Sequence, residues 1–197
     1  MRIVVSGTHA SGKSTLIADF VAAHPEFEVL DDPFESIDEV SDAPDAGAFF
    51  AQLRVAAARL HTLPPQAEVI AERGPLDFVA YLRALESLRR PGRSSDLRER
   101  GVQLAEASAG CVDLLVVLPL TARDRIGVPA DEDPELREAM DEALLELIDD
   151  SDLVGTARVV ELTGSPAERL AGLEEAAGLT RSSGTPTAPG PSADGRR

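Results

Sequence analysis

The sequence predicts an α/β fold of three layers, in which a five-stranded parallel sheet lies between helices. Short apolar stretches alternate with longer helical patterns along most of the chain, and this alternation is typical of parallel sheets. Residues 112–118 form a near-continuous apolar run, the pattern of a strand buried on both faces. A glycine-rich turn, residues 7–12, separates the first predicted strand from the first predicted helix.

The first half of the chain is expected to hold three strands and three helices. In chain order these are a strand at 2–6, a helix at 13–23, a strand at 27–30, a helix at 48–63, a strand at 67–71 and a helix at 75–88. Pro25 ends the first helix, and Pro64 with Pro65 ends the second, because proline cannot continue a helix. The segment 34–47, rich in acids, serine, proline and glycine, is expected to be a loop.

The second half continues the alternation and ends in a polar tail. We expect a loop at 89–95, a helix at 96–109, a strand at 112–118, a loop at 119–134, a helix at 135–148, a strand at 158–162 and a helix at 166–178. Residues 180–197 are mostly serine, glycine, proline, threonine and alanine without apolar periodicity, which predicts a disordered tail. Residues 1–179 therefore form the single predicted domain.

Composition narrows the classes of function. The net charge of −16 argues against nucleic acid as the main partner, because phosphate backbones demand a basic face. No apolar run approaches the roughly 20 residues that span a bilayer, and no signal peptide is visible at the start. One cysteine, Cys111, excludes an internal disulfide framework. The expectation is a soluble cytoplasmic protein without membrane or nucleic-acid partners; the sequence leaves its oligomeric state open.

The phosphate-binding pattern G-x-x-x-x-G-K-[ST] is complete from Gly7 to Ser14, between a predicted strand and a predicted helix. Glycines let successive backbone N–H groups point at phosphates, and the helix N-terminus adds its positive dipole end. Lys13, the one lysine among 19 basic residues, is expected to bridge the β- and γ-phosphates of ATP, and the Ser14 hydroxyl to bind Mg²⁺. The expected nucleotide-binding residues are Gly7, Thr8, His9, Ala10, Ser11, Gly12, Lys13, Ser14 and Thr15.

Glu72 and Arg73 close the third predicted strand. Ligands of open α/β sheets bind beyond the carboxyl ends of parallel strands, so we expect this pair in the site, with Glu72 helping to hold Mg²⁺. The alternatives are a solvated acid and a surface ion pair. For His9, a side chain that the loop merely tolerates is favoured over an acid–base role.

Three segments together carry a resemblance: residues 3–15, residues 72–77 and residues 162–166. With them the chain resembles P-loop nucleoside/nucleotide-kinase-like proteins, and within these the AAA-type ATPase group that includes the ribosylnicotinamide kinase domain. The resemblance implies a P-loop NTPase fold with a five-stranded parallel sheet, phosphoryl transfer, and an arginine-bearing lid around 119–134. It also implies that Gly164 and Ser165, after the last strand, pack on the adenine.

The implied lid contains Arg123 and Arg125, and Arg137 follows on the next helix. Cationic lid side chains would neutralise charge on the transferring phosphoryl group. Arginine is abundant throughout the chain, so an ordinary arginine-rich loop is an equal alternative for Arg123 and Arg125, and a surface ion pair is favoured for Arg137.

Asp31 and Asp32 end the second predicted strand, directly before Pro33. In deoxynucleoside kinases an acid at the corresponding strand end takes the proton from the acceptor hydroxyl, and either aspartate could do the same. An Asp-Asp-Pro turn without a catalytic role is equally compatible with the sequence.

These features favour ATP-dependent phosphoryl transfer to a small-molecule acceptor that resembles a nucleoside. A GTPase is disfavoured, because its guanine-recognising Asn-Lys-x-Asp motif needs a second lysine. A regulatory ATPase that switches a protein partner is the main alternative, and a nucleotide-binding relic without turnover is a third.

Overall fold

The computed structural model describes residues 1–33, 45–90, 94–121 and 133–179. Within these residues, five parallel strands form one sheet in the order β2-β3-β1-β4-β5. The strands are β1 (Arg2–Ser6), β2 (Glu28–Leu30), β3 (Val69–Glu72), β4 (Leu114–Val117) and β5 (Arg158–Glu161). The predicted five-stranded parallel sheet is therefore confirmed.

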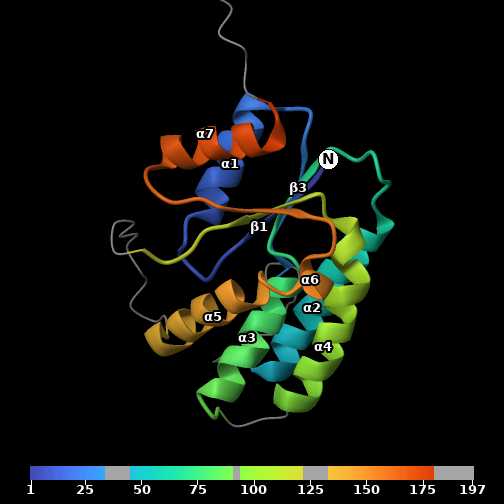
Figure 1. Ribbon diagram of the computed structural model, residues 1–197, viewed down its shortest axis with the longest axis vertical. Helices are drawn as coiled ribbons and strands as arrows, with labels where there is room; N and C mark the ends of the chain where they lie inside the picture. Colours follow the sequence, from blue (N-terminus) through green and yellow to red (C-terminus); the bar gives the residue numbers. More distant parts are fainter. Residues whose placement is uncertain (34–44, 91–93, 122–132, 180–197) are drawn as a thin grey trace, which may run out of the picture.

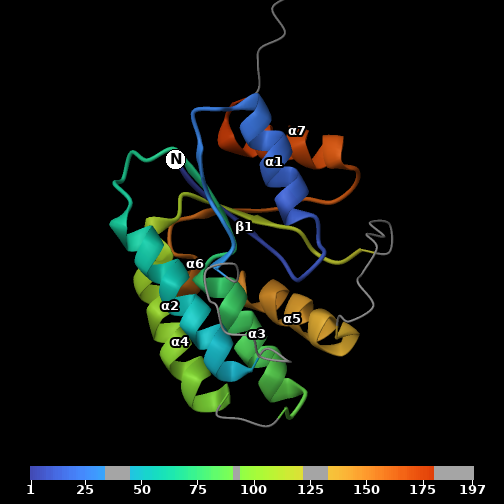
Figure 2. The ribbon, with the colours of Figure 1, turned by 180° about the vertical axis from the view of Figure 1, so that it is seen from behind.

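Helices cover both faces of the sheet (Figure 1). They are α1 (Lys13–Ala23), α2 (Ala46–Thr62), α3 (Pro75–Ser87), α4 (Ser94–Ser108), α5 (Pro134–Leu147), α6 (Ser151–Val154) and α7 (Pro166–Ala177). The helices α1 and α7 lie together on one face, and α2 to α6 lie on the other, which both Figure 1 and Figure 2 show. The three predicted layers are present.

Alternation along the strands divides the core into two clusters. Successive strand side chains point to opposite faces, so Ile3 and Val5 pack with α1 and α7, whereas Val4 packs with the helices of the other face. The strand β4, which neighbours the central strand β1, repeats the pattern, and all four of its residues are buried. This burial on both faces explains why residues 112–118 read as a continuous apolar run.

The register aligns the ends of the strands that carry polar residues. Val5 of β1 pairs with Glu72 of β3, and Leu30 of β2 pairs with Ala71 of β3. The residues that follow β1, β2 and β3 consequently meet at one edge of the sheet. This edge is where open α/β sheets bind ligands.

The observed elements differ from the predicted ones mainly at their ends. The helix α2 begins at Ala46, inside the loop predicted at 34–47, because the Asp45 side chain caps it by accepting a 2.8 Å hydrogen bond from Ala48 N. Two short elements were missed: α6, and a 3-10 turn at Ala109–Cys111. With four and three residues, they are too short to show periodicity. The predicted tail, 180–197, lies outside the described residues.

No helix in the described part of the chain is both long enough and apolar enough to cross a membrane.

Candidate phosphate-binding and phosphoryl-transfer site

The turn between β1 and α1 takes the form of a phosphate-binding loop because glycine occupies its two most demanding positions. Gly7 has φ of 150°, and a Cβ there would lie 2.9 Å from the Leu118 carbonyl oxygen. Gly12 has φ of 95° and is the N-cap of α1. A side chain at either position would strain the backbone or collide with it, so the loop depends on glycine there.

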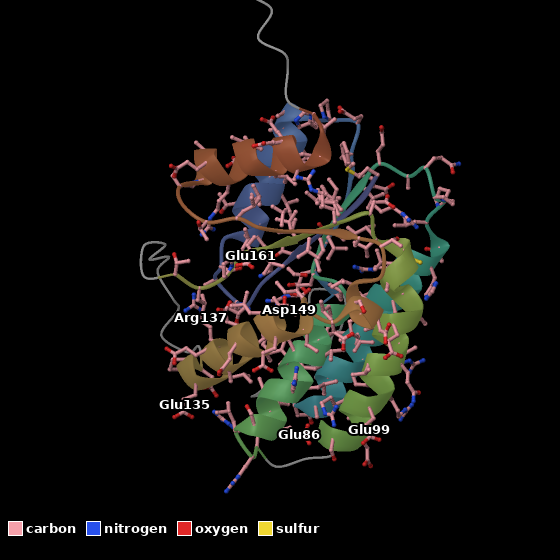
Figure 3. The ribbon with its side chains drawn as sticks, in the orientation of Figure 1. Glu86, Glu99, Glu135, Arg137, Asp149 and Glu161 are labelled. Carbon is pink, nitrogen blue, oxygen red and sulfur yellow. The ribbon has the colours of Figure 1, made fainter. Side chains whose placement is uncertain are left out.

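Cationic side chains bind the carbonyl oxygens of this loop. Arg73 donates to Gly7 O at 3.1 Å, and Lys13 donates to Thr8 O at 2.9 Å. Arg137 of α5 donates from Nε to His9 O at 2.9 Å and from its Nη2 to Ala10 O at 3.3 Å. Figure 3 labels Arg137, which projects from α5 toward the sheet. The sequence favoured a surface ion pair for Arg137, whereas in the structure Arg137 contacts the loop through these two hydrogen bonds.

Lys13 lies at the base of the loop with only 4% of its surface exposed. Its Nζ is 3.9 Å from Glu72 Oε1. Burial lowers the pKa of Lys13 to about 7, and the charge of Arg73 acts in the same direction against the opposing charge of Glu72. Polyphosphate at the loop would supply the negative charge that restores a fully protonated ammonium.

Ser14 and Glu72 form a pair of oxygen ligands beside Lys13. Ser14 Oγ donates a 3.0 Å hydrogen bond to Glu72 Oε1, across the gap between α1 and β3. Burial raises the pKa of Glu72, although Lys13 and Ser14 act in the opposite direction. No group of three or more metal-binding side chains occurs among the described residues. A hydroxyl with one carboxylate suits Mg²⁺, which is bound through few protein ligands and through substrate phosphates.

Arg73 connects the loop to the end of β2. Its Nε donates to Asp32 Oδ2 at 2.7 Å, and its Nη1 lies 3.3 Å from the Tyr81 hydroxyl. Its Nη2 is 3.4 Å from His9 Nδ1. Arg73 has φ of 65°, a left-handed conformation that costs a non-glycine residue about 1 kcal/mol or more. This network holds the guanidinium in place despite that strain.

The structure separates the two aspartates that the sequence left as alternatives. Asp32 lines the same cleft as the loop, whereas Asp31 is exposed and is not among the residues that line this cleft. The backbone oxygen of Asp31 accepts a 2.7 Å hydrogen bond from Arg59 of α2. Asp32 is therefore the aspartate whose carboxylate lies beside the phosphate-binding loop.

Asp77 is a residue of the site to which the sequence gave no role. It is fully buried and accepts hydrogen bonds from Ser6 Oγ at 2.6 Å, Gly7 N at 2.9 Å and Gly74 N at 2.8 Å. Burial raises its pKa, although Arg73 and these three donors act in the opposite direction. Asp77 ties the first residue of the loop to the start of α3. Asp77 lies in the segment 72–77, which contributes to the resemblance to P-loop kinase-like proteins, and this was the indication in the sequence that Asp77 belongs to the site.

Arg169 of α7 was also missed. It is 5% exposed, and its Nη1 donates to Ser11 O at 2.7 Å. Because 158 residues separate the two partners, no local spacing pattern could have indicated this contact.

Most of the predicted residues meet in one cleft. It is lined by His9, Ala10, Ser11, Gly12, Lys13, Ser14, Thr15, Asp32, Glu72 and Arg73. Gly164 and Ser165 lie at the start of α7, where the Ser165 hydroxyl caps the helix by accepting from Glu168 N at 3.3 Å. Arg123 and Arg125 lie outside the described residues, as does most of the predicted lid; the described part includes Leu120, whose N–H donates to Asp141 of α5.

Solved structures similar to this one include two kinases, by their descriptions. Thymidylate kinase from Candida albicans aligns with a TM-score of 0.61 and 18% identity, covering 88% of this chain and 89% of that one. Deoxyadenosine kinase from M. mycoides with bound dCTP aligns with a TM-score of 0.67 and 14% identity, covering 91% of this chain and 100% of that one. This chain has the fold of the P-loop kinases.

The P-loop kinase fold also occurs in part of a longer protein. NadR in complex with NR aligns with a TM-score of 0.62 and 15% identity, covering 91% of this chain and 51% of that one. The similarity to P-loop nucleoside/nucleotide-kinase-like proteins, expected from the sequence motifs, is thus present at the level of fold. No model of a protein family matches the sequence, and no curated protein matches it either.

Proposed function

We propose that this protein transfers the γ-phosphoryl group of ATP, bound with Mg²⁺, to a hydroxyl of a small nucleoside-like acceptor. One observation carries the proposal. The phosphate-binding loop, the Ser14–Glu72 oxygen pair and the Asp32 carboxylate line a single cleft. Phosphoryl transfer needs these three parts together: a phosphate site, a metal site and an acid that accepts the proton of the acceptor.

In this proposal the loop amides and Lys13 hold the β- and γ-phosphates. Ser14 and Glu72 would hold Mg²⁺, which would bridge phosphate oxygens and neutralise part of their charge. Arg73, fixed by Asp32 and Tyr81, would stabilise charge on the transferring group. Arg123 and Arg125 remain proposed lid cations, and Gly164 with Ser165 remain the proposed edge of the adenine site.

Asp32 is the proposed general base. Its carboxylate would accept the proton of the attacking hydroxyl, and the 2.7 Å ion pair with Arg73 holds it at the cleft. A nucleoside-like acceptor is supported by the similar solved structures, whose descriptions name thymidylate kinase, deoxyadenosine kinase and NadR in complex with NR. ATP and Mg²⁺ are available in the cytoplasm, where we propose that the reaction takes place.

The decisive experiment is incubation of the protein with ATP, Mg²⁺ and a metabolite extract, followed by mass spectrometry. The expected result is one nucleoside-like species that gains a phosphoryl group while ATP is converted to ADP. Release of inorganic phosphate without any phosphorylated product would favour the regulatory ATPase instead. If the extract yields neither product, the proposed function is wrong.

A further inference from the structure

Five successive carbonyl groups of the phosphate-binding loop accept hydrogen bonds from cationic side chains. The acceptors are the oxygens of Gly7, Thr8, His9, Ala10 and Ser11. The donors are Arg73, Lys13, Arg137 and Arg169, which come from the turn between β3 and α3, from α1, from α5 and from α7. Four separate parts of the fold thus orient one short stretch of backbone.

Peptide geometry makes these contacts relevant to phosphate binding. In a trans peptide the C=O of one residue and the N–H of the next point in opposite directions, and the described residues contain no cis bond. A cation that holds a carbonyl on the outer side of the loop therefore turns the following N–H toward the inner side. Arg137 and Arg169 are not among the residues that line the cleft, so holding the carbonyls from His9 to Ser11 directs the amides from Ala10 to Gly12 toward the place of the phosphates.

Arg169 differs from two of the other donors, Lys13 and Arg73, in where it lies. Lys13 and Arg73 line the cleft and can reach a bound nucleotide themselves, whereas Arg169 is not among the residues that line it. It reaches the loop from α7, which lies with α1 on one face of the sheet (Figure 1), and it is almost completely buried there. Burying an arginine costs free energy unless its charge is compensated. The 2.7 Å hydrogen bond from Nη1 to Ser11 O links this buried guanidinium to the phosphate-binding loop.

We propose that Arg169 is a positioning residue for phosphate binding. Its guanidinium holds the Ser11 carbonyl so that the Gly12 N–H faces the bound phosphates, and nucleotide affinity therefore depends on how α7 packs against the loop. This inference rests on the proposed nucleotide binding and adds a residue to it. The inference also assigns α7 a function beyond covering the sheet, because α7 supplies the arginine that orients part of the phosphate site.

The test compares Arg169→Met with Arg158→Met. Arg158 also donates to a carbonyl of α7, Ala176 O at 3.0 Å, but at the far end of that helix, so its loss perturbs α7 without touching the loop. Binding of Mg²⁺–ATP and of inorganic tripolyphosphate is measured by calorimetry, and folding by circular dichroism and thermal unfolding. Tripolyphosphate has no adenine, so it reports on the loop alone.

Arg169→Met should weaken the binding of both ligands by the same factor, about tenfold, as expected for losing a charge-assisted contact that orders the site. The Arg158→Met variant should bind Mg²⁺–ATP and tripolyphosphate with the affinities of the wild type. Arg169→Lys, which keeps one charged donor, should recover part of the affinity. If Arg169→Met does not fold, Arg169→Gln replaces it, because glutamine is polar but too short to reach Ser11 O.

Two outcomes would overturn the inference. One is a folded Arg169 variant that binds tripolyphosphate within twofold of the wild type, which would reduce Arg169 to a structural residue. The other is a loss of ATP affinity without loss of tripolyphosphate affinity, which would place its effect at the adenine. A wild-type protein that binds neither ligand would instead contradict the proposed function, so the two failures are distinguishable.

Discussion

Asp32 and Arg73 form an ion pair across the ends of β2 and β3, with Asp32 Oδ2 2.7 Å from Arg73 Nε. Neither partner belongs to the phosphate-binding loop, yet Arg73 also donates to Gly7 O within it. The pair therefore connects the proposed acceptor side of the cleft to its phosphate side. Both groups line the cleft together with Lys13.

Replacing Asp32 by asparagine should reduce phosphoryl transfer by about a hundredfold or more, as expected for the loss of a positioned base. The asparagine oxygen can still accept from Arg73 Nε, so the fold and ATP affinity should change little. Asp31→Asn is the matched control, because that side chain is exposed and outside the cleft. Initial rates with the identified acceptor give the comparison. A greater loss for Asp31→Asn than for Asp32→Asn would reverse the assignment.

Lys13→Met should abolish turnover and leave the thermal stability at or above that of the wild type. The ammonium acts on phosphate oxygens, whereas its burial in the free protein disfavours its charge, as its lowered pKa of about 7 indicates. Turnover and unfolding temperature, measured on the same preparation, separate the two effects. Persisting turnover would refute the assignment of the phosphate-binding loop.

ATP affinity should decrease as pH rises above 7. In the free protein the pKa of Lys13 is about 7, and bound phosphates raise it, so above pH 7 the complex holds more protons than the free protein. The decrease should approach tenfold per pH unit and be accompanied by proton uptake. Calorimetry between pH 7.5 and 9 in buffers of different ionisation enthalpy measures both and avoids the terminal phosphate, whose pKa is about 6. Lys13→Met should show residual binding that is independent of pH over this range.

Glu72→Gln should weaken Mg²⁺-dependent transfer more than it weakens ATP binding measured without metal. The carboxylate lies beside the Ser14 hydroxyl, where it would orient the metal, whereas the loop amides hold phosphates directly. Titration of activity with Mg²⁺ should therefore show a raised metal requirement. An equal fall in both quantities would mean that Glu72 acts only on the structure of the loop.

Asp77→Asn should destabilise the protein by roughly 2 to 4 kcal/mol, the range expected when a buried polar network loses a partner. In either orientation the new amide group places a donor against the Gly7 or Gly74 N–H, both of which need an acceptor. Chemical denaturation measures the loss. Asp133→Asn, at the half-exposed cap of α5, is the control and should cost about 1 kcal/mol or less. Equal losses in the free energy of unfolding for Asp77→Asn and Asp133→Asn would show that burial does not govern the role of Asp77.

The sequence was informative where the chemistry depends on local spacing. Glycines, Lys13 and Ser14 follow one another in a fixed pattern, so the loop and its place between β1 and α1 could be predicted. The sheet was predictable too, because burial on both faces leaves continuous apolar runs such as that of β4. Ends of elements were less certain because caps such as Asp45 lie outside the periodic part.

Contacts between distant segments could not be predicted. Which of two adjacent aspartates faces the cleft depends on how β2 ends against β3, and the sequence contains no measure of that. Arg137 and Arg169 resemble the other 16 arginines of the chain until the fold brings them to the loop. The carbonyl contacts therefore became visible only in three dimensions.

The single lysine gives this protein a built-in chemical reporter. An amine with a pKa of about 7 is substantially neutral, and therefore nucleophilic, at physiological pH, unlike an ordinary lysine side chain. Apart from the N-terminus, Lys13 is the one amine in the sequence, and because only 4% of its surface is exposed, an acylating reagent must be small enough to enter the cleft to modify it. Because its Nζ lies at the proposed phosphate site, bound ATP should protect it, so the fraction of protein acylated would measure site occupancy without any engineered label.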